Sequence, residues 1–191
     1  MLEAIFLGIV QGLTEFLPVS SSAHIRILGE FLPSAQDPGA TFTAIMQIGT
    51  EIAVLIYFRA DIARLISASL NCIIRRDELV GEEKSDARLS GLILLGSLPI
   101  FFLGYLGQEY IRQNFRSLYL IAATLIIFGL LLGVIDHYGK KMKDLDALGA
   151  RDGIAYGIAQ SLALIPGVSR SGATIAMGRY LGYTREAALR Y

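Results

Sequence analysis

The sequence predicts an all-α integral membrane protein, folded as one membrane domain over residues 1–191 and built as an inverted-topology repeat. We expect two re-entrant helical hairpins and three full transmembrane helices. The composition is 53% hydrophobic and 18% charged, with a mean hydropathy of +0.53, which is typical of membrane proteins. Long apolar stretches supply the second observation, and the third is a motif near residue 8 that recurs near residue 157.

The charged residues and the single cysteine exclude several functions. The 17 basic and 17 acidic residues balance, so the sequence indicates no nucleic-acid partner. Cys72 is the only cysteine, which excludes an intrachain disulfide and a zinc cluster of cysteines. The N-terminus lacks the basic region and the cleavage site of a secretory signal peptide, so we expect it to be retained.

Residues 1–39 predict the first re-entrant hairpin. Residues 2–17 are apolar but shorter than the ~20 residues that a spanning helix needs. Pro18 and three serines then interrupt the helix, and a second apolar helix follows before the polar linker 33–39. A helix broken near the bilayer midplane fits a hairpin that returns to the side from which it entered.

This hairpin contains polar side chains that need an explanation in an apolar segment. Gln11 and Glu15 are four residues apart and therefore share one helix face. Serine caps helices, and the N–H groups at a helix start attract anions. We therefore expect one turn to bring together Glu15, Ser20, Ser21, Ser22 and His24. The alternative is a proline-kinked helix with a serine cap, in which the carboxylate and the imidazole are solvated at the membrane edge.

The part of the chain between the two motifs predicts three full transmembrane helices, at 40–58, 89–107 and 117–135. Between the first two spans, the charged segment 59–88 predicts a long loop that includes an amphipathic piece at 62–74 on the membrane surface. A short turn, 108–116, is expected between the last two.

The first of these spans, 40–58, also contains a carboxylate. Gln47 and Glu51 occupy i,i+4 positions inside the first span. An intramembrane carboxylate usually faces protein or a water-filled cavity. No second element in the sequence points to Glu51, so the alternative is a carboxyl near the middle of the helix that is protonated or paired with a polar neighbour.

The distribution of Lys and Arg predicts the orientation of the chain. Segments 59–88 and 136–152 hold six and four of these residues, whereas segment 108–116 holds two. By the positive-inside rule, 59–88 and 136–152 are cytoplasmic. The N-terminus and the linker 33–39 then lie outside the bilayer on the opposite side.

Residues 153–183 predict a second re-entrant hairpin. Gly157 begins the same Gly-Ile-x-Gln-x-Leu pattern as Gly8, and a proline, a valine and serines follow in both copies. Because an odd number of spans separates the copies, the second hairpin should enter from the opposite face. Broken helices of inverted repeats normally meet near the bilayer midplane and form the binding site.

The second copy adds a cation to the expected site. Arg170 lies between two serines, with Thr174 close behind and glycines at 167 and 172. Glycine permits close approach of the backbone, hydroxyl and N–H groups donate hydrogen bonds, and the guanidinium fork fits phosphate oxygens. This composition indicates an anion site. The alternative is an arginine that snorkels to the membrane surface or pairs with an acid near a helix end.

The segments GLTEFLPVSSSAH and PGVSRSGAT resemble the two signature motifs of the undecaprenyl-diphosphate phosphatase family, also called bacitracin-resistance proteins, and the resemblance covers essentially the whole chain. It implies a bacterial inner-membrane enzyme that removes the terminal phosphate of undecaprenyl diphosphate, a polyprenyl diphosphate lipid. The product is the lipid carrier of peptidoglycan synthesis. The resemblance also implies a divalent cation, Mg²⁺ or Ca²⁺, as cofactor.

The resemblance carries over position by position. The family's acidic motif corresponds to Gln11 and Glu15, and its serine motif to Ser20, Ser21 and His24. Family members have Glu or Gln at the position of Gln11, so that residue is not expected to be an obligatory base. The family's phosphate motif corresponds to Gly167, Ser169, Arg170, Ser171 and Thr174.

The hydrolysis of a diphosphate suggests a chemical role for four of these residues. Arg170 is expected to neutralise the phosphoryl oxygens, and Glu15 to bind the metal cation or to act as general base. Ser21 is the candidate nucleophile or phosphate ligand, and His24 the candidate for proton transfer. Direct attack by water is the alternative to a seryl phosphate. The other residues of the motifs are expected to bind the diphosphate.

Residues 184–191 predict the start of a further helix, because Thr184 is a capping residue and Glu186 lies in the first turn. Since the family continues through several more helices, the chain is expected to be truncated. Two other functions remain open at this stage. A lipid flippase or anion-coupled transporter could use the same inverted repeat, and a truncated chain could be an inert fragment. Homo-oligomerisation is also left open.

Overall fold

The computed structural model of the chain describes residues 1–33, 39–75, 79–114, 117–139 and 142–191, without the side chains of residues 40, 108 and 112–114. Its regular elements are helices, and the one pairing of extended segments among these residues is an isolated bridge between Lys143 and Tyr183. The predicted all-α class is confirmed for the described part of the chain. The elements are α1 (Leu2–Glu15), α2 (Ser21–Phe31), α3 (Gly39–Tyr57), α4 (Arg59–Ile74), α5 (Gly81–Asn114), α6 (Leu118–Tyr138), η2 (Leu145–Ala147), α7 (Ala150–Ser161), η3 (Leu162–Leu164), α8 (Arg170–Tyr180) and α9 (Arg185–Arg190).

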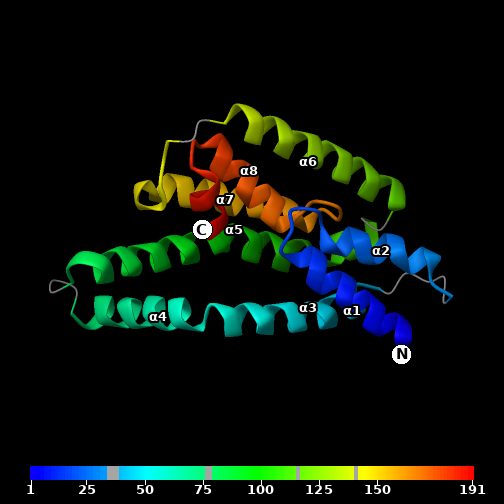
Figure 1. The fold of residues 1–191 in the computed structure, drawn as a ribbon, viewed down its shortest axis with the longest axis horizontal. Coiled ribbons are helices and arrows are strands. Elements are labelled where there is room, and N and C mark those ends of the chain that lie inside the picture. The colour runs from blue at the N-terminus through cyan, green and yellow to red at the C-terminus, as the bar shows by residue number, and fades with distance from the viewer. Residues whose placement is uncertain (34–38, 76–78, 115–116, 140–141) are drawn as a thin grey trace.

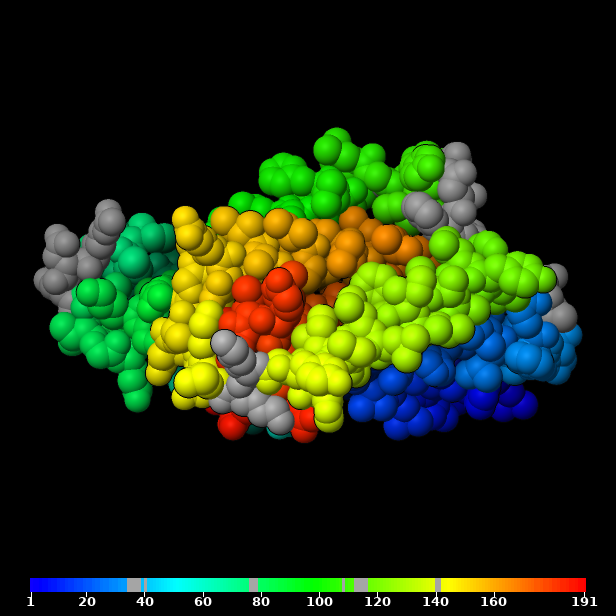
Figure 2. All heavy atoms as spheres, turned by 90° about the horizontal axis from the view of Figure 1, so that it is seen from above, coloured from blue at the N-terminus to red at the C-terminus, as the bar shows by residue number. Residues whose placement is uncertain are grey.

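The helices form an elongated bundle (Figure 1). Helix α4 packs against α5, α5 packs against α7, and α6 packs against α8. The N-terminal pair α1 and α2 lies at one end of the molecule, where α1 contacts α3 and α2 contacts α6. Figure 2 shows α6 lying across the face of the molecule between this pair and the helices α7 and α8.

Within the described part of the chain, two helices are long and apolar enough to cross a membrane, at Gly81–Gly107 and Leu118–Tyr138. A third crossing requires Thr41–Tyr57 and Arg59–Ile74 together, two helices bent by 74° at the break between them. The predicted spans 89–107 and 117–135 therefore have matching helices, whereas span 40–58 needs α4 to complete it. Only 11% of the apolar window of each of these helices is buried, and many of its apolar side chains are exposed, which suits a lipid environment.

The segments predicted as a long loop at 59–88 and a short turn at 108–116 are helical over most of their described residues, and residues 76–78 and 115–116 lie outside the described part of the chain. Helix α4 fills residues 59–74, and α5 runs without interruption from Gly81 to Asn114. The amphipathic helix expected at 62–74 is present within α4. Glu82 and Glu83 lie in the first turn of α5, where negative charge stabilises the helix dipole. Hydropathy shows where the apolar part of a helix ends, but the helix itself can continue into the charged residues beyond it.

Both predicted hairpins contain two short helices that pack against each other, α1 with α2 and α7 with α8. Helix α1 has 14 residues and α2 has 11, so each is at most about 21 Å long. A hydrocarbon core of about 30 Å exceeds that length. Helices α7 and α8 have 12 and 11 residues. Each pair brings the chain back toward its starting end (Figure 1).

Glycines allow α7 to approach α5 closely. A Cβ atom at Gly157 would lie 2.2 Å from the backbone oxygen of Gly96, and one at Gly96 would lie 3.0 Å from that of Gly153. These distances are too short for any side chain, so the two helices touch through their backbones. The contact fixes α7, and through it the second hairpin, against the long helix α5.

The far end of α8 is anchored by a buried arginine. Arg179 is fully buried, and its Nε donates a hydrogen bond of 2.8 Å to Oδ1 of Asp136 on α6. Its Nη1 donates one of 2.6 Å to the backbone oxygen of Tyr183. A buried charge is tolerated only when it is paired and hydrogen-bonded in this way. The clamp holds α8 on α6 and thereby sets the position of its N-terminal end, where Arg170 lies.

Candidate active site

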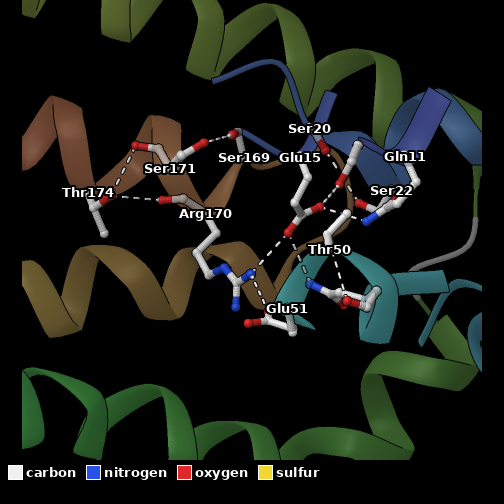
Figure 3. A network of polar contacts seen from close by, with 12 residues as sticks. Gln11, Glu15, Ser20, Ser22, Thr50, Glu51, Ser169, Arg170, Ser171 and Thr174 are labelled. Carbon is white, nitrogen blue, oxygen red and sulfur yellow. Dashed lines mark hydrogen bonds and ion pairs between the residues drawn. The ribbon is translucent and has the colours of Figure 1, made fainter. Parts of the chain in front are cut away.

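The tips of the two hairpins meet in the middle of the molecule (Figures 1 and 3). Nη2 of Arg170 lies 3.0 Å from Oε1 of Glu15, although the two residues are 155 positions apart in the chain. Oγ of Ser171 donates a hydrogen bond of 3.3 Å to the backbone oxygen of Leu17. The structure thus brings together the two motifs that the sequence analysis placed in one site.

Glu15, the last residue of α1, is the centre of this contact. Its Oε2 accepts hydrogen bonds from Nε2 of Gln11 at 2.7 Å and from Oγ of Ser21 at 2.5 Å. Its Oε1 accepts from Nε2 of Gln47 at 3.2 Å and from Arg170. The side chain is only 12% exposed. Four donors around one carboxylate satisfy the ionised form, which accepts hydrogen bonds and donates none.

Ser21 is oriented as an activated nucleophile would be. Its hydroxyl proton points to Glu15, and hydrogen bonding of a hydroxyl to a base is the arrangement that makes serine reactive. Ser21 is also the first residue of α2. The carboxylate in turn is held by Arg170 from the other hairpin. Ser21, Glu15 and Arg170 therefore form one connected set.

The turn before α2 is held in an unusual backbone conformation. Ser20 has φ 62° and ψ 90°, the one positive φ at a described residue other than glycine. It is 4% exposed, and its Oγ lies 3.4 Å from Oγ of Ser22. Residues held in this region of φ and ψ cost of order 1–3 kcal/mol and cluster at functional sites. Ser20 therefore contributes backbone geometry to the site.

His24 lies apart from the carboxylate. Its Nδ1 donates a hydrogen bond of 2.9 Å to the backbone oxygen of Ser20, because a carbonyl oxygen can only accept. The tautomer leaves Nε2 as the proton acceptor. His24 makes no described contact with Glu15 or Arg170, and it is absent from the described lining of the cavity. Its proton-transfer role stays a prediction.

The second tip is built around Gly167 and Ser169. Gly167 has φ 96°, and a Cβ there would lie 2.0 Å from Oγ1 of Thr124. Oγ1 of Thr124 donates a hydrogen bond of 2.8 Å to the backbone oxygen of Pro166. Ser169 caps α8 by accepting from the backbone N–H of Gly172 at 3.1 Å. Gly167 therefore shapes and packs the turn, rather than only opening its backbone to an anion.

Two further residues of the phosphate motif lie at the start of α8. Oγ of Ser171 is 3.1 Å from Oγ of Ser169. Oγ1 of Thr174 lies within hydrogen-bond distance of the backbone oxygens of Arg170 and Ser171, at 3.2 and 3.0 Å. Both side chains line the cavity described below. The Thr174 hydroxyl thus bonds to its own helix, and the Ser171 hydroxyl contacts the Ser169 cap and the backbone oxygen of Leu17.

Sequence reasoning did not find every residue of the site. Gln47 was noticed, but its contact with Glu15 was not predicted, because the contact joins two helices 32 positions apart in the chain. Thr124 was missed. It is 8% exposed and is the one Ser or Thr in helix α6, and this aliphatic hydroxyl among apolar residues was the available signal.

A cavity of about 770 Å³ opens beside these side chains. This volume is within the range of small-molecule sites. Its lining includes polar side chains from both tips and α3, namely Gln11, Glu15, Ser20, Ser21, Gln47, Glu51, Ser169, Arg170, Ser171 and Thr174. It also includes the apolar side chains Phe16, Val54, Phe58, Ile93, Ile100, Leu164 and Val168. The cavity matches a molecule with an anionic head and a hydrocarbon chain.

Fold and site together define a helical membrane protein with a carboxylate, a serine hydroxyl and an arginine that meet beside a cavity lined by both polar and apolar side chains. Residues 4–191 match the family described as bacitracin resistance protein BacA, and the chain belongs to this family.

Curated relatives agree with the family assignment. The chain is 58% identical over 190 residues to an undecaprenyl-diphosphatase of Micrococcus luteus, covering 100% of this chain and 68% of the relative. It is 59% identical over 190 residues to undecaprenyl-diphosphatase 2 of Agrobacterium fabrum, covering 100% and 67%. An undecaprenyl-diphosphatase of Pseudarthrobacter chlorophenolicus is 55% identical over 189 residues, covering 99% and 67%. The chain thus spans about two-thirds of the length of these relatives.

Proposed function

We propose that the chain hydrolyses undecaprenyl diphosphate to undecaprenyl phosphate and inorganic phosphate, which recycles the lipid carrier for peptidoglycan synthesis and confers bacitracin resistance. The observation that carries this proposal is the contact of Glu15 with both Ser21 and Arg170, at 2.5 and 3.0 Å. The names of the relatives point to the same reaction. A transporter needs an anion site, but it has no evident use for a serine hydroxyl bonded to a carboxylate.

The mechanism begins with nucleophilic attack on the terminal phosphorus. Glu15 takes the proton of Ser21 as the serine oxygen forms a bond to phosphorus, and the bond to the bridging oxygen breaks in line with it. Undecaprenyl phosphate leaves with the electron pair of that bond. Glu15 passes the proton of Ser21 to solvent and is ionised again. Water then attacks the seryl phosphate and Glu15 takes a proton from the water. Glu15 returns that proton to the serine oxygen as the oxygen–phosphorus bond breaks, and inorganic phosphate is released. Direct attack by a water molecule in place of Ser21 would use the same base.

Arg170 provides the charge that the phosphoryl group requires. Its guanidinium can donate to two phosphoryl oxygens at once, and the capped N-terminal end of α8 adds backbone N–H groups. Gln11, Ser20, Gly167, Ser169, Ser171 and Thr174 complete the proposed binding set around the diphosphate. His24 holds the Ser20 turn through Nδ1, and its free Nε2 is the proposed proton-transfer atom.

A divalent cation, Mg²⁺ or Ca²⁺, fits the charges of the site. The described residues contain no group of three or more His, Cys, Asp or Glu side chains that could hold a metal alone. Mg²⁺ is commonly bound by one or two carboxylates together with substrate phosphates, and Glu15 is the proposed protein ligand. When bound, the cation would neutralise charge that develops on the phosphoryl oxygens.

The membrane arrangement is also a proposal. We infer that the two hairpins are re-entrant halves of an inverted repeat, that they enter from opposite faces of the bacterial inner membrane, and that segments 59–88 and 136–152 are cytoplasmic. The hairpins approach the site from opposite ends of the molecule (Figure 1), and their tips touch.

A homo-oligomer of the chain is a separate proposal. Blue-native electrophoresis of the purified protein would detect it.

The test is phosphate release from a polyprenyl diphosphate by the purified chain in detergent. We expect release by the parent chain, and losses of at least about 100-fold for Glu15→Ala, for Arg170→Ala and with EDTA. Circular dichroism at 222 nm checks that each variant is folded. Release that persists in Arg170→Ala would contradict the assignment, and binding without release by the parent would favour a transporter.

A further inference from the structure

Helix α3 supplies two contacts to the site that the proposed mechanism does not use. Nε2 of Gln47 donates to Oε1 of Glu15 at 3.2 Å, and Oε1 of Glu51 lies 3.3 Å from Nη2 of Arg170. The same Nη2 lies 3.0 Å from Oε1 of Glu15. Figure 3 shows the arginine between the two carboxylates. One face of α3 therefore contacts both members of the pair that joins the hairpin tips.

The two carboxylates that share Arg170 differ in how firmly they are held. Glu15 is 12% exposed and accepts hydrogen bonds from Gln11, Ser21 and Gln47 besides Arg170. The Glu51 side chain is 53% exposed, and Arg170 is its one described partner. An exposed ion pair is worth about 0.2–1 kcal/mol, less than a carboxylate held by several donors. Glu51 is therefore the partner that an incoming anion displaces more easily.

The charges in the cavity favour such a displacement at Nη2, the one guanidinium nitrogen that both carboxylates contact. One guanidinium faces two carboxylates, so the three side chains together carry one net negative charge. A diphosphate brings further negative charge and needs the donors of Arg170. A phosphoryl oxygen can take Nη2 only when a carboxylate gives up its contact.

We propose that Glu51 sets the affinity of the site, as a displaceable counter-ion that positions Arg170 in the empty cavity and is replaced by phosphoryl oxygens when substrate binds. This inference rests on the proposed function for the identity of the substrate. The exchange of ligands at Arg170 can be tested independently of that function, because an inorganic diphosphate can replace the lipid in a binding measurement.

The proposal predicts that removing the charge of Glu51 tightens binding. Glu51→Gln keeps the shape of the side chain but loses both the competition for Arg170 and the repulsion of the anion. We expect the dissociation constant for inorganic pyrophosphate to fall about three- to tenfold. The KM for polyprenyl diphosphate should fall by a similar factor, with kcat within about threefold of the parent. Damage to the fold would weaken binding rather than strengthen it.

The experiment is isothermal titration of the full chain in detergent with inorganic pyrophosphate in the presence of EDTA, followed by lipid kinetics. Glu51→Asp keeps the charge and should stay within about twofold of the parent. Glu30→Gln is the matched control, because Glu30 pairs with Arg26 on α2 and is absent from the cavity lining. Arg170→Ala should lose pyrophosphate binding.

Tighter binding in Glu51→Gln but not in Glu30→Gln supports the proposal. An unchanged or weaker affinity in Glu51→Gln, or no binding of pyrophosphate by either protein, overturns it. A loss of kcat as large as that of Glu15→Ala also overturns it, because Glu51 would then act in catalysis itself. If the parent chain binds pyrophosphate but releases no phosphate from the lipid, the proposed function fails while the comparison of affinities still decides the role of Glu51.

Discussion

The two hairpin tips are copies of one motif that carry different chemistry. When Gly8 is placed on Gly157, Ser20 falls on Ser169, and each serine precedes a helix of 11 residues, α2 or α8. The chemical positions do not match. Leu164 is at the position of Glu15, and Arg170 at that of Ser21. A repeated sequence pattern thus contributes the proposed base and nucleophile from one copy and the proposed cation from the other.

The tips also differ in where the backbone departs from ordinary conformations. Each turn contains one residue with positive φ, which is Gly167 in the second tip and Ser20 in the first. Glycine adopts this conformation without a steric cost, whereas serine does not. The copy that carries the proposed nucleophile is therefore the strained one. This difference suggests that the first tip is shaped for chemistry and the second for a stable anchor on α6.

The largest effect on stability is expected at the unstrained tip. Gly167→Ala places a Cβ 2.0 Å from Oγ1 of Thr124 and 2.8 Å from the backbone oxygen of Ile121, at φ 96°. We expect a loss of about 2–4 kcal/mol, because strain and overpacking add. Thermal unfolding followed by circular dichroism measures it. The control is Gly12→Ala on α1, where nothing lies within 4 Å of the new atom; equal losses in both variants would contradict the anchor.

A smaller effect should distinguish the two serines. Ser20→Gly relieves the positive φ and should stabilise the chain by about 1 kcal/mol. Ser169→Ala removes the hydrogen bond from the N–H of Gly172 and should destabilise it by about 1 kcal/mol. Thermal unfolding of both variants tests the contrast. If Ser20→Gly lowers the midpoint instead, the turn before α2 is not strained and the comparison of the tips breaks down.

The sequence predicted the class of fold and the partners in the site, but not all of the helix ends. Apolar stretches located α5 and α6, and the repeat located both hairpins. The continuation of α5 through the charged residues before position 89 was missed, because a helix that leaves the bilayer remains stable in water and hydropathy records only the environment. The hydropathy pattern also did not predict the bend of 74° between α3 and α4.

Within the site, residue chemistry was easier to predict than geometry. Glu15, Ser21 and Arg170 were recognised by type and spacing, and they meet. The positions of His24 and Gly167 depend on the backbone of each turn, which is set by contacts with Ser20 and Thr124. The partner of Glu51 required tertiary structure, since α3 and α8 are 119 positions apart at this contact.

The measurement that tests the central claim most directly is a double-mutant cycle on kcat/KM for polyprenyl diphosphate, with Glu15→Gln and Arg170→Lys. If one carboxylate and one arginine from different tips form a single unit, each single variant should lose about 100- to 1,000-fold. The double variant should then be little worse than the poorer single variant, because residues that act as a unit are not additive. Losses that simply multiply would show that the two tips act independently and would contradict the account.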